Sequence, residues 1–457
     1  MFKRLLVAVL TVIVLAAVSA MAPALAAETG APEAEAAFEA PETLDMEQAV
    51  LMALERNPSI MAARYEALGA EDGRKSSRGD FGPSVSMSYT YSRLDHKKPN
   101  RDAVVVTSDV DRYTATLNVH QDLFTGWRLL STYEKAILTK DQAEAQVRNA
   151  ELNLIGMVQQ NFLGLLKARS DVKSGQDSVS RLEEQLKVTK AFYDVGLKPR
   201  LDLLQAQTNL ATAKDTLLQA QNDVDTQIAR LNTLLGLPLE ADVDYRGELE
   251  YLPFSLGLDE ALASAYETRP DLDIARKAVA IARKSKKITD AAFYPQIGAD
   301  LDWSTQGGDP KAAGSIHSKT EYSDWTASVG ATWTIFEWGK THYASKQAQK
   351  TILQMEQELA NTRLEASFEI KSGHLAIHEA SERINVRRQA LEEARESYRM
   401  AVARYQAQVG TNADVLDAQS ELTDAESALT QALADYQTAI SGIFVSMGQQ
   451  NPALNTN

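Results

Sequence analysis

The 457-residue chain contains no cysteine. Without thiols it can form neither disulfides nor a thiolate metal site, and it cannot carry a lipid on an N-terminal cysteine. We therefore expect a non-lipidated protein. Basic residues are also outnumbered, because 47 Lys and Arg stand against 62 Asp and Glu, for a net charge of −15. Nucleic acids are themselves polyanions, so this charge argues against them as partners.

Long apolar runs are absent after residue 26, since none reaches the about 18 residues of a membrane-spanning helix. Residues 1–26 have the pattern of a secretory signal peptide: basic Lys3 and Arg4, an apolar run from Leu5 to Ala17, and a small-residue cleavage motif at 24–26. The cleavage motif favours removal over the alternative of a retained anchor. Residues 27–43 are rich in Ala, Pro and Glu, which predicts a flexible lead-in.

Residues 325–336 (WTASVGATWTIF) alternate between apolar and small polar side chains, as the two faces of a strand do. The alternating part, 325–335, has 11 residues, and a tilted strand needs about 9–11 to cross a bilayer core. Three more stretches alternate in the same way: 84–92, 113–120 and 297–304. Their second face carries mostly Ser, Thr, Gly and Asp, which favours the wall of a water-filled lumen over the surface of a soluble sheet. An exported chain with such strands and no membrane helix is expected in a bacterial outer membrane.

Both ends of these predicted strands carry features of a membrane barrel. Aromatic residues form two groups, as expected for two aromatic girdles: Phe81, Phe124, Phe293, Tyr294, Phe336 and Trp338 at one end, and Tyr91, Tyr113, Trp303 and Trp325 at the other. The loops at 93–112 and 305–324 are long and polar, as outer loops of such barrels are.

Similar residues recur at a constant offset of 212 along most of the chain. Asn57-Pro58 matches Arg269-Pro270, Tyr193 matches Tyr405, and Ala206-Gln207 matches Ala418-Gln419. One offset held over so long a span predicts an internal duplication. The predicted halves are 44–240 and 256–450, joined by a connector at 241–255 and followed by a tail at 451–457.

Proline is missing between Pro99 and Pro199 and again between Pro310 and Pro452, and helical periodicity fills both gaps. In the second half it predicts helices at 345–406 and 413–445, and the first half has a matching pair that ends with 202–235. A helix of about 65 residues would be about 100 Å long, which suits a coiled-coil array better than a globule. Each half is therefore predicted as helix, strand, strand, long helix, turn and helix, an α+β membrane protein.

Four strands cannot close a barrel, and an open edge in lipid would leave backbone groups unsatisfied. The chain is therefore predicted to oligomerise. Two copies would supply eight strands and three would supply twelve. Twelve leave more room for a lumen, so the pattern weakly favours three.

Over residues 44–450 the chain resembles the TolC family of outer-membrane efflux ducts. The matching features are the duplication, the motif at 53–58 (ALERNP), the element at 123–126 (LFTG), and two turn motifs at 195–207 and 409–419. The resemblance implies a homotrimer with a 12-stranded β-barrel and a hollow periplasmic α-barrel. It also implies an exit duct for efflux or type I secretion that works with a periplasmic adaptor and an inner-membrane transporter.

The same resemblance implies roles for two sets of residues. The turns that would dock onto the adaptor are Val195, Gly196, Leu197, Val409, Gly410 and Thr411. Asp414 and Asp417 would form rings of carboxylates at a periplasmic constriction. Two departures leave the closing of the tip open: the second turn has two residues fewer between its Gly and Asp, and Ala407 and Asn412 stand where some members carry polar gating residues.

Each of these assignments has a simpler alternative. A Gly that ends a helix, followed by a capped restart, explains both turns without any partner. Thr411 and Asp414 fit a capping box, which would account for Asp414 alone. His374 and His378 lack an evident third metal ligand, and Gly339-Lys340-Thr341 fits a strand-to-helix turn better than a phosphate loop.

No catalytic constellation, cofactor site or metal site is predicted. A periplasmic coiled-coil scaffold or adaptor, and a helical enzyme, remain as alternative functions. The scaffold would leave four lipid-suited strands without a role, and no site supports the enzyme.

Overall fold

The structure is a computed structural model that describes residues 42–93, 111–307, 310 and 322–450. The predicted signal peptide, most of the lead-in, most of both outer loops and the tail at 451–457 lie outside the described residues. The chain divides into two compact units. In the smaller one the described residues are 42–43 and 242–244, where the Asp244 N–H donates to the Glu42 carbonyl at 3.0 Å. Apart from Thr43 and Asp244, all residues described below belong to the larger unit. No helix of the described residues is long and apolar enough to cross a membrane.

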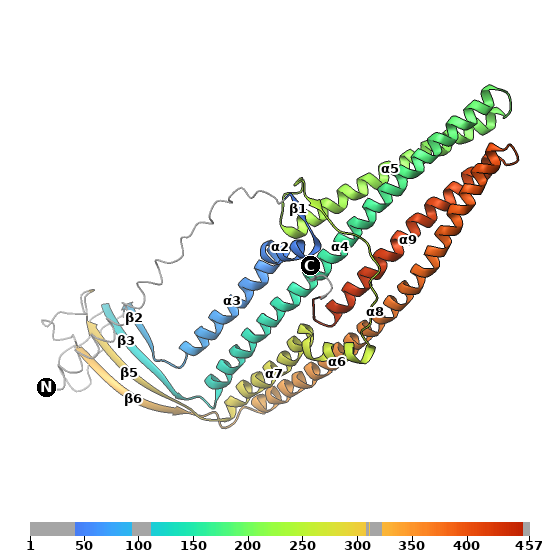
Figure 1. Cartoon of the computed structure of the whole chain (residues 1–457). Helices are drawn as coiled ribbons and strands as arrows, with labels where there is room; N and C mark the ends of the chain where they lie inside the picture. The colour runs from blue at the N-terminus through green and yellow to red at the C-terminus, as the bar shows by residue number, and fades with distance from the viewer. Residues whose placement is uncertain (1–41, 94–110, 308–309, 311–321, 451–457) are drawn as a thin grey trace, which may run out of the picture. The chain divides into compact units, whose positions relative to one another are not determined.

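The helices and strands follow one another in the same order in both parts of the chain (Figure 1). The first part contains β1 (Thr43–Leu44), α2 (Met46–Arg56), α3 (Pro58–Gly79), β2 (Ser84–Arg93), β3 (Asp111–Phe124), α4 (Arg128–Asp194) and α5 (Arg200–Leu235). The second contains β4 (Asp244–Tyr245), α6 (Leu258–Thr268), α7 (Pro270–Asp290), the short η1 (Ala291–Phe293), β5 (Gln296–Gly307), β6 (Tyr322–Thr332), α8 (Lys340–Gln406) and α9 (Asn412–Ser446). The predicted pairs of long helices are confirmed.

Two helices, not one, precede the strands in each part, which corrects the sequence-based layout. The break falls before Pro58 and before Pro270, because proline disfavours the helical conformation in the residue that precedes it. Asn57 then caps α3, since its side-chain oxygen accepts from the Ser59 N–H at 2.9 Å. Its amide nitrogen donates to the Leu234 carbonyl at 2.8 Å, so the same residue ties α3 to the end of α5.

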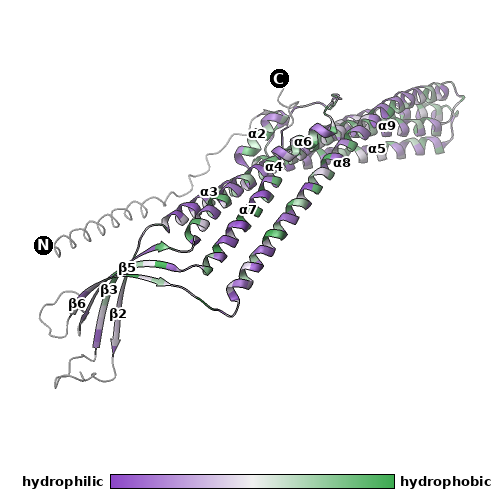
Figure 2. Ribbon diagram, turned by 90° about the horizontal axis from the view of Figure 1, so that it is seen from below, coloured by the Kyte–Doolittle hydropathy of each residue, from purple (hydrophilic) through white to green (hydrophobic). Residues whose placement is uncertain are grey.

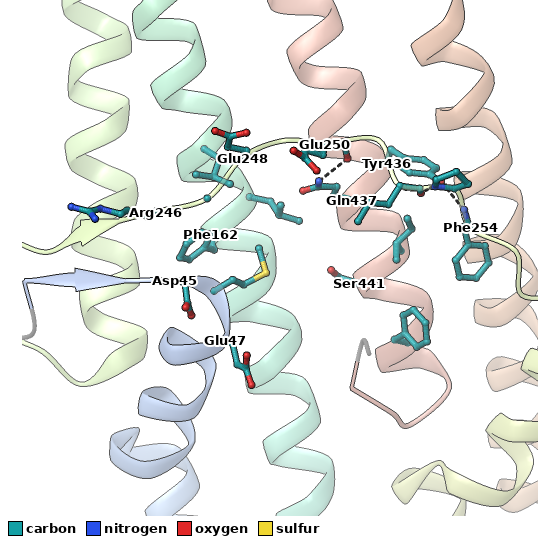
Figure 3. A pocket seen from close by; sticks show the side chains of 18 of the residues that line it. Asp45, Glu47, Phe162, Arg246, Glu248, Glu250, Phe254, Tyr436, Gln437 and Ser441 are labelled. Carbon is teal, nitrogen blue, oxygen red and sulfur yellow. Dashed lines mark hydrogen bonds between the residues drawn. The ribbon is translucent and has the colours of Figure 1, made fainter. Parts of the chain in front are cut away.

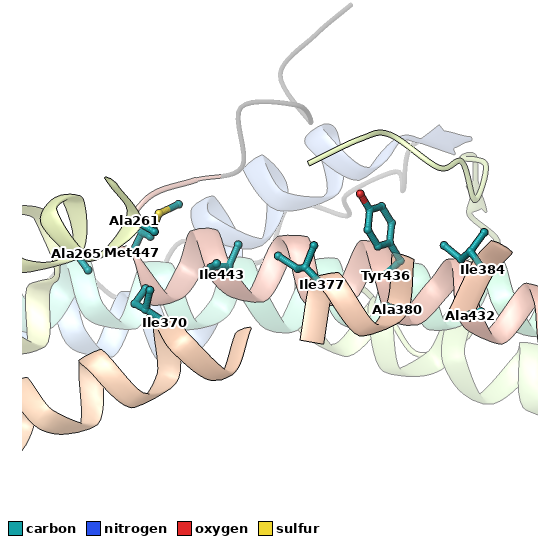
Figure 4. Close-up of a cluster of buried hydrophobic side chains, with 10 residues drawn as sticks. All are labelled: Ala261, Ala265, Ile370, Ile377, Ala380, Ile384, Ala432, Tyr436, Ile443 and Met447. Carbon is teal, nitrogen blue, oxygen red and sulfur yellow. The ribbon is translucent and has the colours of Figure 1, made fainter. Parts of the chain in front are cut away.

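The two long helices, α4 and α8, each have 67 residues, and each packs along the shorter helix that follows it. Hydrophobic and hydrophilic residues alternate along both (Figure 2). Figure 4 shows the buried cluster in the second part of the chain. Its members come from α6 (Ala261, Ala265), α8 (Ile370, Ile377, Ala380, Ile384), α9 (Ala432, Tyr436, Ile443) and the residue after α9 (Met447).

The four longer strands form one antiparallel sheet in the order β2-β3-β5-β6 (Figure 1). β6 begins at Tyr322 and ends at Thr332, which differs from the predicted strand at 325–336. The reason is its neighbour: Thr332 pairs with Gln296, the first residue of β5, so the chain beyond it has no partner strand in this sheet. The register also pairs Tyr91 with Tyr113 and Trp303 with Trp325, which places these four predicted girdle aromatics at one end of the sheet.

All four connections between this sheet and the helices lie at the same end of the strands. α3 leads into β2 and α7 into β5, whereas β3 leads into α4 and β6 into α8. In an antiparallel sheet with this order, the first residues of two strands and the last residues of the other two lie at the same end of the sheet. The four segments there (80–83, 125–127, 291–295 and 333–339) are called the sheet–helix junctions below.

Candidate functional site

Two turns of equal length end the long helices. Residues 195–199 join α4 to α5, and residues 407–411 join α8 to α9, so each turn has five residues. The new helices start with Pro199 and Thr411 in the capping positions, as predicted. The two turns remain in register, although the glycine is the second residue of one and the fourth residue of the other.

The two turns require glycine for different structural reasons, which corrects the prediction that each glycine ends its helix. Gly196 has a φ of 78°, the left-handed conformation that favours glycine after a helix. In the second turn the left-handed residue is Gln408 (φ 63°) instead. Gly410 is needed for space, because a Cβ there would lie 3.1 Å from the Tyr405 nitrogen and 3.2 Å from Arg404.

The apolar side chains of both turns are exposed in the single chain, as predicted. The exposed fractions are 69% for Val195, 53% for Leu197 and 69% for Val409. Most of their apolar surface therefore gains no burial from the fold around it. These residues are therefore available to a partner.

A layer of buried polar side chains lies directly behind the turns and joins all four long helices. Gln185 on α4 donates to the side-chain oxygen of Asn412 on α9 at 2.9 Å. The Asn412 amide donates in turn to the Asp202 carbonyl on α5 at 3.2 Å. Tyr405 on α8 donates to the Thr189 hydroxyl at 3.1 Å, and that hydroxyl lies 3.3 Å from the Asn412 oxygen. We call Gln185, Thr189, Tyr405 and Asn412 the polar layer; all four are buried.

The first turn also contacts the second turn through Lys198. Its ammonium donates to the Gly410 carbonyl at 3.4 Å and lies 4.9 Å from the centre of the Tyr405 ring. Burial raises the pKa of the Tyr405 phenol, so its hydroxyl stays protonated and can donate to Thr189. The polar layer and Lys198 together connect the ends of the two helix pairs.

Asp414 and Asp417 lie in the first turns of α9, and both are exposed. The capping box is confirmed: the Thr411 N–H donates to an Asp414 carboxylate oxygen at 2.9 Å, and the Asp414 N–H donates to the Thr411 hydroxyl oxygen at 3.1 Å. These hydrogen bonds to Thr411 lower the pKa of Asp414. Asp417 takes no part in the capping box.

The contact between α4 and α9 remains polar well beyond the turns. Gln419 donates to the Ser178 hydroxyl at 3.3 Å, and Arg181 pairs with Glu426 at 3.0 Å. Ser427 donates to Asp171 at 3.1 Å. One helix pair therefore meets the other through hydrogen bonds and an ion pair in this region, whereas the cluster of Figure 4 is apolar.

The polar face of the sheet carries a small group of acids around one histidine. His120 on β3 lies 2.7 Å from an Asp300 carboxylate oxygen on β5 and 3.5 Å from Asp122. Gly298 makes room for this ring, since a Cβ there would lie 2.9 Å from the His120 Cε1 atom. Asn118 donates to Asp302 at 2.8 Å on the same face.

One pocket, with a volume of about 610 Å³, lies beneath the connector (Figure 3). The connector is held over α9 by Tyr436, whose hydroxyl donates to the Leu252 carbonyl and accepts from the Phe254 N–H. Gln437 donates to the Glu250 carbonyl at 2.8 Å. The floor is apolar and includes Phe162. The pocket brings together none of the predicted site residues.

The remaining candidates of the sequence do not come together as sites. Within the described ranges, no group of three His, Cys, Asp or Glu side chains could hold a metal ion, and His374 and His378 gain no third ligand. Gly339 has a φ of 82° and precedes α8, so Gly339-Lys340-Thr341 is the strand-to-helix turn.

Sequence reasoning missed three of the four members of the polar layer. Asn412 was singled out because some members of the family carry polar gating residues there, but Gln185 and Thr189 lie more than 220 residues earlier. Tyr405 stood out only as the counterpart of Tyr193. That match gave no signal of its role, because only the structure shows that Tyr405 is fully buried whereas Tyr193 is exposed.

Comparisons with known proteins agree with this fold. The sequence model of the family described as outer membrane efflux protein matches residues 50–237 and 261–449. The alkaline protease secretion protein AprF of Pseudomonas aeruginosa is 25% identical over 85% of this chain and 81% of its own length. The probable efflux pump outer membrane protein TtgC of Pseudomonas putida is 25% identical over 75% of this chain and 70% of its own length. The crystal structure of VceC from Vibrio cholerae has a TM-score of 0.75 at 19% identity and covers 89% of this chain and 96% of that one.

Proposed function

We propose that this chain, which belongs to the outer membrane efflux protein family, acts as a homotrimer whose twelve strands close one β-barrel. It is an outer-membrane exit duct for efflux or type I secretion, as family members are transport channels rather than enzymes. The trimer, the barrel and the residue roles below are the proposal.

The observation that carries the trimer is the open sheet. β2 and β6 are its edge strands, and within the described residues neither has a second partner. Their apolar side chains, among them Met87 and Val329, are exposed. Unpaired backbone groups cannot remain in lipid, so the edges must pair with other copies. Two copies give a barrel that side chains fill, whereas three leave a lumen lined by the polar face that bears His120 and Asp300.

The helices support the same assembly. Large apolar side chains remain exposed on α3 and α5 (Tyr65, Leu68, Leu201, Leu204, Leu218) and on α8 (Leu353, Leu364, Phe368, Leu375). These are two different surfaces, so a contact between them would be head-to-tail, the type of contact that forms a ring when the rotation between copies closes. Such a ring would continue the barrel as an α-barrel in the periplasm, and an internal duplication would explain its repeated helices.

The turns are the docking site of the proposed complex. Val195, Gly196, Leu197, Val409, Gly410 and Thr411 would contact a periplasmic adaptor that serves an inner-membrane transporter. Their apolar side chains support this role, because more than half of each is exposed in the described part of the chain. Asp414 and Asp417 would form the periplasmic constriction. The protein would be exported by its signal peptide and carry no lipid. AprF is described as a protein of alkaline protease secretion and TtgC as a probable efflux pump outer membrane protein, so the comparisons point to no single cargo for this chain.

Fractionation and cross-linking test the proposal. The mature chain should appear in the outer membrane and should need detergent to remain soluble. Because the chain has no native cysteine, single cysteines introduced on β2 and β6 in one chain can report contact between copies. Oxidation should produce species of two and three chains and none larger. A detergent-free monomer would end the duct proposal and leave the scaffold alternative.

A further inference from the structure

Basic residues are concentrated where the helices meet the sheet. The eight helical residues nearest each sheet–helix junction are 72–79, 128–135, 283–290 and 340–347. Together they contain eleven Lys or Arg and three Asp or Glu, in a chain whose net charge is −15. The eight residues nearest the turns, counted in the same way, contain five Lys or Arg and four Asp or Glu. The positive charge therefore belongs to one end of the helices.

Five of the eleven cations are not neutralised within the part of the chain that the structure describes. Arg74, Lys75, Arg128, Arg283, Lys284 and Lys286 form ion pairs. The other five make no ion pair with a described residue: Arg78, Lys135, Lys287, Lys340 and Lys346. We call these five the basic collar. Arg78, Lys287 and Lys340 are exposed and belong to three different junctions.

Exposed aromatic side chains lie at the same four junctions. They are Phe81, Trp127, Phe293, Tyr294, Trp333, Phe336 and Trp338. Trp127 and Trp338 have left-handed backbones (φ 72° and 50°), which is unusual for so bulky a residue. Trp338 is 89% exposed. Such strain without burial indicates a surrounding that the single chain does not supply.

We infer that the junctions bind anionic phospholipids of the membrane surface, with the aromatic side chains among the acyl chains and the basic collar at the headgroup phosphates. Tryptophan and tyrosine favour the boundary between hydrocarbon and water, and cations just outside it attract anionic headgroups. A soluble anionic partner would account for the collar but not for the aromatic side chains beside it. The inference rests on the proposed insertion of the sheet into the outer membrane.

The chain contains its own reporter for a test. All five tryptophans, Trp127, Trp303, Trp325, Trp333 and Trp338, lie in the sheet or its junctions. Their emission should be quenched by brominated lipid when the full-length protein is reconstituted. Brominated phosphatidylglycerol in a background of phosphatidylcholine should quench more strongly than brominated phosphatidylcholine at the same fraction. Inorganic phosphate should not remove the difference, because a free anion lacks the acyl chains.

The variant Arg78→Gln with Lys287→Gln and Lys340→Gln removes one collar charge at three junctions. The preference for phosphatidylglycerol should fall about fivefold, since a lipid bound at any of these junctions loses the attraction of one nearby cation. Lys187→Gln with Lys190→Gln and Arg200→Gln removes three charges at the turn end and should leave the preference unchanged. Arg78→Lys with Lys287→Arg and Lys340→Arg keeps the charges and should keep the preference, which separates charge from folding.

The outcomes separate binding of anionic lipid at the junctions from membrane insertion of the sheet. Equal quenching by both lipids, or an equal loss of preference in the collar and turn-end variants, would overturn the inference and leave the duct intact. Displacement by inorganic phosphate would also overturn it in favour of a soluble anion. Absence of quenching by either lipid would instead contradict membrane insertion itself.

Discussion

Gln185 on α4 and Asn412 on α9 share a buried hydrogen bond of 2.9 Å, and they lie 227 positions apart in the chain. Together with Tyr405 and Thr189 they join two helix pairs that otherwise meet there through exposed turns. Buried amides are tolerated only when they are satisfied, so this bond constrains how the pairs align. The first prediction concerns its loss.

Asn412→Ala should destabilise the turn end by about 1–3 kcal/mol, because it removes the hydrogen bonds of Asn412 to Gln185 and to the Asp202 carbonyl and leaves Gln185 with only its 3.3 Å bond to Thr189. The measurement is the thermal unfolding midpoint, combined with amide exchange in α4 and α9 near the turns. Asn209→Ala is the matched control, since Asn209 is exposed and bonds only within α5. If both variants unfolded alike, the polar layer would have no structural role.

Gly298→Ala should destabilise the sheet by about 1–3 kcal/mol, since the new methyl group must displace the His120 ring. Gly330 is opposite Gly298 in the register, and a Cβ there meets nothing within 4 Å, so Gly330→Ala is a control in the same cross-strand pair. Adding His120→Ala should remove most of the penalty of Gly298→Ala in a double-mutant cycle measured by thermal unfolding. An undiminished penalty would place the clash elsewhere.

Asp414 should make the start of α9 sensitive to acid. Its pKa is lowered in the folded chain by the bonds to Thr411, from an ordinary value of 3.8. A lowered pKa gives stabilisation that is complete above the ordinary value and is lost as the pH falls through the folded value. The stability difference between the native chain and Asp414→Asn should therefore be constant from neutral pH to about pH 5 and shrink below pH 4. Thermal unfolding at several pH values measures it, and a difference independent of pH would contradict the capping role of the charge.

Val195→Glu with Val409→Glu should abolish transport while leaving assembly intact. Both side chains are exposed, so a charge costs the fold little but would oppose an apolar partner. Export of a known cargo is measured beside the mass of the detergent-solubilised assembly. The control is Lys190→Glu, an exposed change on α4 outside the turn. Normal transport in the double variant would remove the turns from the docking surface.

Asp414→Asn with Asp417→Asn should reduce cation selectivity and block by a trivalent cation in single-channel recordings. Three copies would bring six carboxylates to one axis, and both residues are exposed rather than buried in the chain. The single replacements separate the two roles, because only Asp414 belongs to the capping box. Unchanged selectivity in the double variant would reduce both residues to the chemistry of a helix start.

Periodicity and proline placement were sufficient for the four long helices and most of the sheet, but not for the break between the two helices that precede the strands in each part. The two gaps without proline mark α4, α8 and α9, helical periodicity after Pro199 marks α5, and alternation marks all four longer strands. The misplaced end of β6 shows the limit of this reasoning. Alternation continues through Trp333 and Ile335, but pairing stops where β5 begins, and the sequence of β6 alone cannot indicate where its partner starts.

The turns show a second limit. A glycine in a loop is most readily interpreted as a left-handed residue, and at Gly196 that is right. At Gly410 the requirement is space beside Arg404, which depends on a backbone that the sequence does not reveal. The polar layer was beyond reach for a similar reason, because its members meet only after four helices have packed.

The equal lengths of α4 and α8 and of the two turns have a geometric consequence. Each long helix extends about 100 Å from the same end of the sheet, so both turns lie at about the same level. Three copies would then present six tips in one plane, alternating between two kinds that differ in where their glycine stands. A partner with six similar sites could engage all of them, whereas one with three could select either kind. Deleting one residue from a single turn would lower every second tip and break that common plane.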